Sequence, residues 1–124
     1  MPPRKSIIAS MGPRERMIMD ILWADSHRHL SVREVAGRLG EDIAYTTVMT
    51  LLTRLHLKGL LRRRQEGKAY TYQPKVSDAE YAAASMSATM ERGANVSEVL
   101  MRFVGQLSPS EQETLRTILE EQRR

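Results

Sequence analysis

Residues 44–60, AYTTVMTLLTRLHLKGL, decide the fold of this chain. Their apolar members recur at the i, i+3, i+4, i+7 spacing of a helix with one buried side, and they are Val48, Leu51, Leu52 and Leu55. The opposite side has Thr46, Thr50, Thr53 and Arg54, with Thr47 and Met49 at its edges. No acidic residue occurs from position 45 to position 58. The stretch therefore predicts a helix with an apolar back and an acid-free front.

Such a front is suited to the major groove of DNA. Threonine hydrogen-bonds base edges or contacts the thymine methyl group, and arginine binds phosphate or guanine. An ordinary amphipathic helix whose threonines face water has the same pattern, although threonine is locally unfavourable in helices. The segments on either side of this helix decide between the two interpretations.

Two shorter helices are predicted before the central one. The first spans about residues 13–23 and has a proline in its first turn, where proline is tolerated. The second spans about residues 32–39. Ser31 and Glu34 form a capping box at its start, and Gly40 ends it.

After Gly59, which ends the central helix, the pattern of residues 60–74 changes to period two. Two alternating runs are separated by a turn at residues 66–68, and this arrangement predicts a β-hairpin. Basic side chains of the hairpin are expected to hold DNA phosphates, and they are Arg62, Arg64 and Lys68. A charged edge strand that resists aggregation is the alternative explanation of these arginines.

Three helices followed by a hairpin make a winged helix, whose central helix enters the major groove while the hairpin lies along the neighbouring backbone. The predicted fold class is therefore mainly α with a small β-hairpin wing. Residues 1–10 are expected to be a flexible tail and residues 11–75 the winged-helix DNA-binding domain. Residues 76–124 are expected to be a helical dimerisation domain.

Residues 76–124 are predicted to form helices at about 78–91 and 96–107, and a last helix that starts at a capping box of Ser108 and Glu111. So short a segment cannot bury its own apolar side chains, so it packs on the winged helix or on the same segment of a second chain. A second chain is favoured, because a two-fold dimer binds two half-sites one helical turn apart. The expected interface residues are Tyr81, Met86, Met90, Val99, Leu100, Phe103, Leu107, Leu115 and Ile118.

Charge is distributed unevenly along the chain. Residues 1–75 contain 14 Lys and Arg against 7 Asp and Glu, whereas residues 76–124 contain 5 against 8. The formal net charge of +4 is therefore divided into +7 and −3. This asymmetry is typical of a polyanion-binding module joined to one that binds protein.

The composition excludes several classes of protein. The 124 residues are 41% hydrophobic and 27% charged, as in a globular domain. The absence of cysteine excludes disulfides, thiolate metal sites and cysteine nucleophiles. No apolar run approaches the roughly 18 residues of a membrane helix, and the first residues lack the apolar core of a secretory signal. A cytoplasmic location is expected.

An enzyme is not expected. His27, His29 and His56 do not form a ligand set, and solvated loop histidines explain the first two better than a metal site does. The sequence has no nucleophile elbow and no phosphate-binding glycine motif. Neither a metal nor another cofactor is therefore expected.

Three motifs are shared with a known group of regulators: SVREVAGRL at residues 31–39, the stretch at residues 44–62, and GKAYTYQP at residues 67–74. Together they resemble the penicillinase-repressor family of the BlaI/MecI type, which also includes copper-responsive CopY proteins. The resemblance covers roughly residues 11–121. It implies a homodimeric winged-helix repressor on palindromic operators of the TACA/TGTA kind, controlling genes such as those of β-lactamase or other antibiotic resistance. It further implies base contacts by Thr46, Thr47 and Thr50, with Met49 beside them, and phosphate contacts by Arg54 and the wing.

The resemblance also bears on how such a repressor is released. In the β-lactamase branch, a membrane sensor-protease pathway leads to cleavage within the dimerisation helices. The matching bond in this chain joins Arg102 and Phe103, although the family more often has asparagine before that phenylalanine. In the copper branch a C-terminal cysteine motif senses the metal, and this chain has no cysteine.

Two other binding functions are compatible with the sequence. One is a small-molecule-responsive winged-helix regulator with a pocket lined by Met86, Met90 and Met101, although methionines at helical spacing more often fill cores. The other is a winged helix that contacts protein. Such a module does not need the basic run at residues 62–64 beside an acid-free helix.

Overall fold

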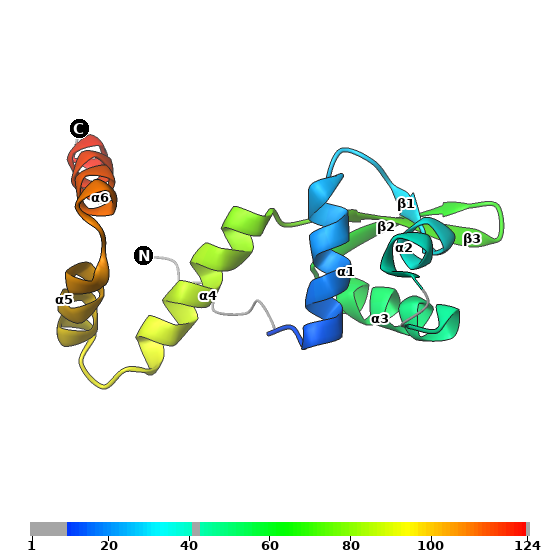
Figure 1. Ribbon diagram of the computed structural model, residues 1–124, viewed down its shortest axis with the longest axis horizontal. Helices are drawn as coiled ribbons and strands as arrows, with labels where there is room; N and C mark the ends of the chain where they lie inside the picture. The colour runs from blue at the N-terminus through cyan, green and yellow to red at the C-terminus, as the bar shows by residue number, and fades with distance from the viewer. Residues whose placement is uncertain (1–9, 41–42, 124) are drawn as a thin grey trace. The chain divides into compact units, whose positions relative to one another are not determined.

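The computed structural model describes residues 10–40 and 43–123 (Figure 1). Along the chain the elements are α1 (Pro13–Ala24), β1 (Leu30–Ser31), α2 (Val32–Leu39), α3 (Tyr45–Leu57), β2 (Leu61–Glu66), β3 (Ala69–Pro74), α4 (Asp78–Arg92), α5 (Val96–Gln106) and α6 (Pro109–Gln122). They form two compact units, which divide between Ser85 and Met86 within α4. The expected tail, apart from Ser10, lies outside the described residues. None of the described helices is long and apolar enough to cross a membrane.

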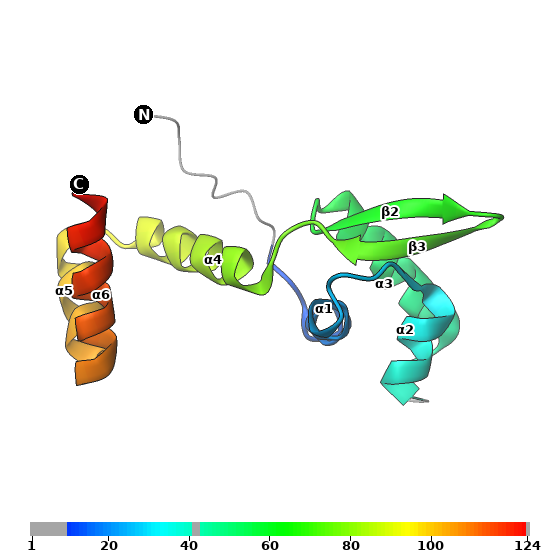
Figure 2. The same cartoon turned by 90° about the horizontal axis from the view of Figure 1, so that it is seen from above.

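The first unit is a winged helix, as predicted. Helices α1, α2 and α3 lie on one side of an antiparallel sheet, whose strand order among the described residues is β1-β3-β2 (Figure 2). All four members of the predicted apolar stripe of α3 are buried beneath this sheet. The core of the unit consists of Ile18, Met19, Leu22, Leu30, Val32, Val35, Ile43, Val48, Leu51, Leu52, Leu55, Leu60, Leu61, Tyr72 and Tyr81.

The helix boundaries follow the signals in the sequence. Ser31 Oγ accepts a hydrogen bond from the backbone N–H of Glu34 at 3.0 Å, and the Glu34 carboxylate accepts one from the N–H of Ser31 at 3.1 Å. This reciprocal pair is the predicted capping box of α2. Gly40 and Gly59 have φ angles of 80° and 85°, which glycine adopts without the steric cost of a Cβ. They therefore end α2 and α3 where expected.

The sheet joins the wing to the helices. Leu30 of β1 pairs with Tyr72 of β3, and both side chains lie in the core. Strands β2 and β3 form the predicted hairpin, with Gly67 and Lys68 left as the turn. The hairpin is thus anchored at its base and extends beyond the core at its tip.

The start of α4 belongs to the first unit. Tyr81, which the sequence analysis places in a dimer interface, is buried in the core of the winged helix instead. Its ring centroid lies 5.9 Å from that of Trp23, whose indole N–H donates to the carbonyl of Val76 at 2.9 Å. Aromatic side chains bury a large apolar area, so this contact fixes the first turns of α4. The compact unit accordingly ends at Ser85, beyond the expected boundary at residue 75.

A buried ion pair ties α1 to the end of α3. The Nζ of Lys58 lies 2.9 Å from the carboxylate of Glu15, and the N–H of Gly12 donates to the same carboxylate at 3.1 Å. Burial raises the pKa of Glu15, but the hydrogen bonds from Lys58 and Gly12 and the charges of Lys58 and Arg54 outweigh it. The pKa of Glu15 is therefore held below its ordinary value of 4.5.

A Glu15→Gln variant is expected to lose about 1–2 kcal/mol of unfolding free energy near neutral pH, because Lys58 then keeps a partly buried charge without a counter-charge. Since the folded-state pKa of Glu15 is depressed, its contribution is complete above about pH 4.5 and is lost as pH falls through the folded-state value. Urea unfolding of both proteins across this range checks the prediction. A gap that stays constant between neutral and acidic pH contradicts it, and Lys58→Gln completes the double-mutant cycle.

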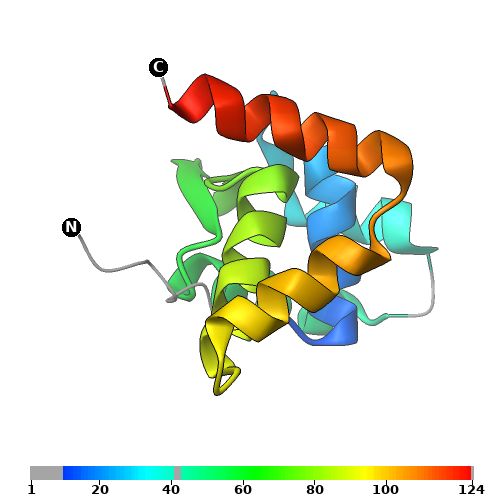
Figure 3. The same ribbon diagram turned by 90° about the vertical axis from the view of Figure 1, so that its left-hand side faces the viewer.

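The second unit contains the end of α4 together with α5 and α6. Asn95 and Ser108 cap the starts of α5 and α6, and the capping box of Ser108 and Glu111 is present as predicted. In Figure 3 the two helices run away from their short connection like the arms of a V. A Cβ at Gly93, between α4 and α5, would lie 2.7 Å from Cγ2 of Val99, so the turn requires glycine.

Candidate nucleic-acid interface

The exposed side of α3 displays the residues predicted to contact bases. Thr46, Met49 and Thr50 are exposed, whereas Thr47 is half-buried at the edge of this side. Arg54 is exposed one turn after Thr50. Since α3 has no acidic residue, nothing on the helix itself repels a phosphate backbone.

The hydroxyl groups on this side make hydrogen bonds within the helix. Thr50 Oγ1 donates to the carbonyl of Thr46 at 3.0 Å, and Thr53 Oγ1 donates to the carbonyl of Met49 at 3.0 Å. Because each hydroxyl proton is engaged, the oxygen remains an acceptor and the methyl group remains an apolar surface. In this arrangement Thr50 is suited to accept from an adenine or cytosine amino group or to contact a thymine methyl.

A groove of about 590 Å³ runs between α3 and the first turn of α1. A smaller groove of about 350 Å³ lies along the other edge of the same side, beside Met49, Thr53 and Leu57. The exposed side of α3 is thus bounded by concave surfaces. The larger groove is lined by Gly12, Pro13, Arg14, Glu15, Thr46, Thr47, Thr50, Leu51 and Arg54.

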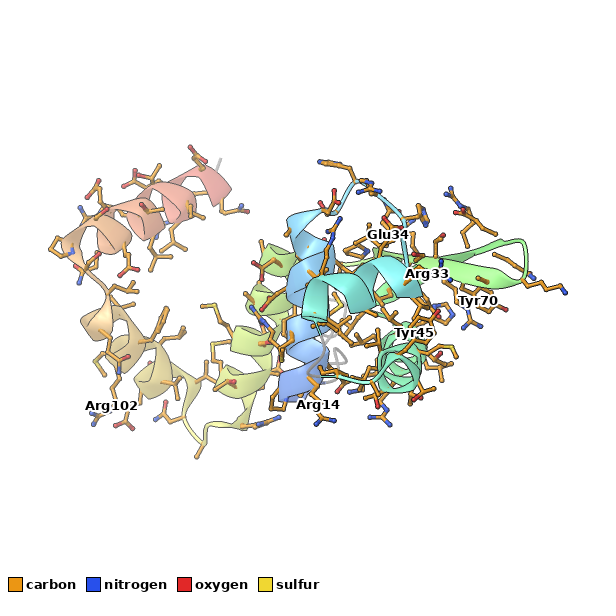
Figure 4. All side chains as sticks on the ribbon, turned by 45° about the vertical axis from the view of Figure 1, so that its right-hand side comes forward. Arg14, Arg33, Glu34, Tyr45, Tyr70 and Arg102 are labelled. Carbon is orange, nitrogen blue, oxygen red and sulfur yellow. The ribbon has the colours of Figure 1, made fainter. Side chains whose placement is uncertain are left out.

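Two guanidinium groups line the larger groove from its opposite walls, Arg14 on α1 and Arg54 on α3. The one acidic residue of the lining, Glu15, is paired with Lys58, so the groove keeps a positive charge. Arg14, labelled at the start of α1 in Figure 4, is a candidate contact that was not predicted from the sequence. The sequence did contain a signal for Arg14. A cation in the first turn of a helix lies at the positive end of the helix dipole, where it is unfavourable, and this points to a role other than helix stability.

On the wing, the three residues predicted to contact phosphates differ in whether a carboxylate lies beside them. Arg62 and Lys68 are exposed. Arg64 donates to Oε2 of Glu66 from Nε at 3.2 Å and from Nη2 at 2.8 Å, and Thr71 Oγ1 donates to the same oxygen at 2.9 Å. These hydrogen bonds from Arg64 and Thr71 hold the pKa of Glu66 below its ordinary value. The charge of Arg64 is thus balanced by a neighbouring carboxylate.

The loop after α1 is held by ion pairs. Asp25 accepts from Arg38 and from Arg28, each at 3.1 Å, and these contacts hold the pKa of Asp25 below its ordinary value. His27 and His29 lie in the same loop. Among residues 10–40 and 43–123, no three His, Cys, Asp or Glu side chains are placed to hold a metal ion.

The predicted dimer residues other than Tyr81 lie in the second unit. Met86, Leu100, Phe103 and Ile118 are exposed to between 39% and 56%. Met90, Val99, Leu107 and Leu115 are half-buried. Other large apolar side chains of this unit are also exposed and were not among the predicted interface residues: Val96, Met101, Val104 and Leu119. A groove of about 420 Å³ between α5 and α6 is lined by Val104, Gln112, Leu115, Arg116, Leu119, Glu120 and Arg123.

The expected cleavage bond lies inside a regular helix. Arg102 and Phe103 are both in α5, and the side chain of Arg102 is 76% exposed and paired with Glu98 at 3.1 Å. The methionines of the ligand-responsive alternative are not gathered in an enclosed site within one chain, because Met86 and Met101 are exposed to 56% and 68%.

Comparison with known proteins places these features in a group of regulators. The chain is 34% identical over 119 residues to the transcriptional regulator BlaI of Mycobacterium tuberculosis, a match that covers 92% of this chain and 86% of the relative. It is 28% identical over 120 residues to the penicillinase repressor of Bacillus licheniformis, covering 92% of each protein.

Solved structures agree with the fold. The solution structure of the DNA-binding domain of the repressor BlaI superposes with a TM-score of 0.52 at 28% identity, covering 60% of this chain and 90% of that domain. A complex of MepR from S. aureus with DNA has a TM-score of 0.50 at 21% identity, with 90% and 77% covered, and it supports the fold alone. The family model described as penicillinase repressor matches residues 11–121. The chain therefore belongs to the penicillinase repressor family, whose members are transcriptional regulators and not enzymes.

Proposed function

We propose that this protein is a homodimeric repressor that binds palindromic operators of the TACA/TGTA kind and controls genes of the β-lactamase or antibiotic-resistance type. The observation that supports it most is the exposed side of α3, which is free of acids and is bordered by a groove with Arg14 and Arg54. Thr46, Thr47 and Thr50, with Met49, contact base edges. Phosphates are held by Arg54, by Arg14 and by the wing.

The second unit provides the dimer contact in this proposal. Its helices α5 and α6 leave large apolar side chains exposed, among them Leu100 at 46% and Leu119 at 55%. Large apolar side chains gathered at the surface of one unit are typical of an interaction site. A second copy of this chain covers this surface in the proposal, because a two-fold dimer places two α3 helices on successive major grooves, about 34–36 Å apart.

Release by proteolysis completes the proposal. The bond between Arg102 and Phe103 lies in α5, so cutting it separates the apolar surface that joins the two copies. A helical bond must open locally before a protease accommodates it. Terminal sequencing of repressor fragments from cells treated with a β-lactam tests this step, and a new N-terminus at Phe103 is expected. An intact chain in induced cells contradicts release by cleavage and favours a ligand.

Titration of labelled duplexes at several salt concentrations tests the proposed DNA binding. A dimer that neutralises about eight phosphates gives a log–log slope near −7. The palindrome is expected to bind tighter than a scrambled duplex of equal composition at every salt concentration. Equal affinity for the two duplexes contradicts operator recognition. Absence of duplex binding at low salt favours a winged helix that contacts protein.

A further inference from the structure

The two faces of the wing differ, and strand alternation assigns each residue to one of them. Successive side chains of a strand point to opposite faces, and paired residues of antiparallel strands share a face. Arg63 pairs with Tyr72, whose ring lies in the core with Leu61. Arg63 and Tyr70 therefore share the face that packs on the helices. Arg64 pairs with Thr71 on the opposite face.

Arg63 is held in place without losing its charge. Its guanidinium carbon lies 4.0 Å above the centroid of the Tyr70 ring, which is 39% exposed. A ring face attracts a cation through its quadrupole and occupies none of the guanidinium N–H groups. The N–H groups that point away from the ring stay available to a phosphate oxygen, and the side chain loses little further freedom on binding.

Arg64 is in the opposite situation. Both of its hydrogen bonds go to Oε2 of Glu66, which also accepts from Thr71. A phosphate bound by the remaining N–H groups of Arg64 would lie beside the Glu66 carboxylate, whose negative charge repels it. The electrostatic free energy gained when Arg64 contacts a phosphate is therefore largely offset by the repulsion between that phosphate and Glu66.

The helix side of the sheet is also the side on which α3 lies, as Figures 1 and 2 show. Figure 4 labels Tyr70 on the wing and Tyr45 at the start of α3. Tyr45 is 50% exposed, so α3 begins with an accessible aromatic residue and the adjoining wing face has a second one with its stacked arginine.

We propose that Arg63, positioned by Tyr70, contacts a DNA phosphate from the wing, and that Arg64 contributes little to phosphate binding. This role of Arg63 rests on the proposed binding of duplex DNA. It differs from the prediction made from the sequence, which assigned the phosphate contacts of the wing to Arg62, Arg64 and Lys68 and did not include Arg63.

The matched pair Arg63→Ala and Arg64→Ala tests the proposal, because the two changes remove the same group from adjacent positions. In the dimer, Arg63→Ala is expected to weaken specific and random duplexes alike by roughly 10- to 30-fold at moderate salt and to flatten the salt slope by about 2. Arg64→Ala is expected to change affinity by less than about twofold and to leave the slope unchanged.

Two further variants test the positioning role of Tyr70. Tyr70→Phe keeps the ring and is expected to bind as the wild type does, whereas Tyr70→Leu is expected to lose part of the affinity that Arg63→Ala loses. Circular dichroism and thermal unfolding establish that each variant is folded, and Arg63→Gln replaces Arg63→Ala if the latter is not.

The possible results separate this proposal from the proposed function. Wild-type protein that does not bind duplexes at all overturns the proposed function. Wild-type binding with a larger loss from Arg64→Ala than from Arg63→Ala overturns only the assignment of Arg63. Equal losses from both variants also overturn it, because the ion pair with Glu66 then leaves Arg64 fully available.

Discussion

A Phe103→Asp variant is expected to sediment as a monomer and to lose at least about 100-fold of the affinity for a palindromic operator, because one chain then binds each half-site without the avidity of the pair. Phe103 is 39% exposed in the isolated chain, on the same side of α5 as Leu100. In the proposed dimer its ring is covered by the partner. A carboxylate there has to be buried without a counter-charge, which costs more than a typical interface contact contributes.

Met101→Asp is the matched control for this variant. Met101 lies two residues before Phe103, about 200° away around the helix, and is 68% exposed. The same aspartate is introduced into the same helix, so its effects on helix propensity and net charge are matched. Met101→Asp is expected to remain dimeric and to bind the palindrome normally.

Analytical ultracentrifugation and titration of the palindrome against a single half-site provide the measurements. For Phe103→Asp, affinity for the half-site is expected to be unchanged, since the winged helix is intact. A dimeric mass for Phe103→Asp contradicts the placement of Phe103 in the interface. A monomeric wild type contradicts the homodimer itself.

The winged helix could be predicted from sequence because its signals are local. The capping box of Ser31 and Glu34 depends on residues three positions apart, and the apolar stripe of α3 repeats within two turns. Gly40 and Gly59 occupy positions with positive φ, where other residues are strained. Each of these features is determined within a few residues, so no knowledge of the rest of the chain is needed.

The features that could not be predicted depend on partners distant in sequence. Tyr81 has the spacing of an interface residue, but Trp23 lies more than fifty positions earlier and buries it. Nothing in the sequence near Glu15 distinguishes it from a surface residue of α1, and only the fold brings Lys58 beside it. Amphipathic periodicity shows that a side chain is buried and does not show what buries it.

The wing shows the same limit of sequence-based prediction at the level of single side chains. Alternation in sequence correctly separates Arg63 from its two arginine neighbours, but it does not show which face is turned toward α3. That depends on Leu61 and Tyr72, whose side chains enter the core. The pairing of Arg64 with Glu66 likewise depends on rotamers that no periodicity predicts.

A Thr50→Ala variant is expected to lose about 1–3 kcal/mol of binding free energy on the operator and little on random duplex, because Thr50 contributes to base recognition and not to phosphate binding. The hydroxyl of Thr50 donates to the carbonyl of Thr46, so only its oxygen lone pairs and its methyl group remain for the base. Thr50→Val separates these two roles, since it keeps the methyl and removes the acceptor.

Thr53→Ala is the control for the base contact, because Thr53 makes the equivalent hydrogen bond to the carbonyl of Met49 one turn later and is not among the proposed base-contacting residues. Both alanine variants lose the same intrahelical bond and gain the same helix propensity. If Thr50→Val binds like the wild type, Thr50 contacts a thymine methyl, and if it binds like Thr50→Ala, the hydroxyl accepts from a base amino group. Equal weakening of operator and random duplex by Thr50→Ala, or an equal effect of Thr53→Ala on the operator, removes Thr50 from the recognition surface. The discrimination between sequences then belongs to other positions on the exposed side of α3.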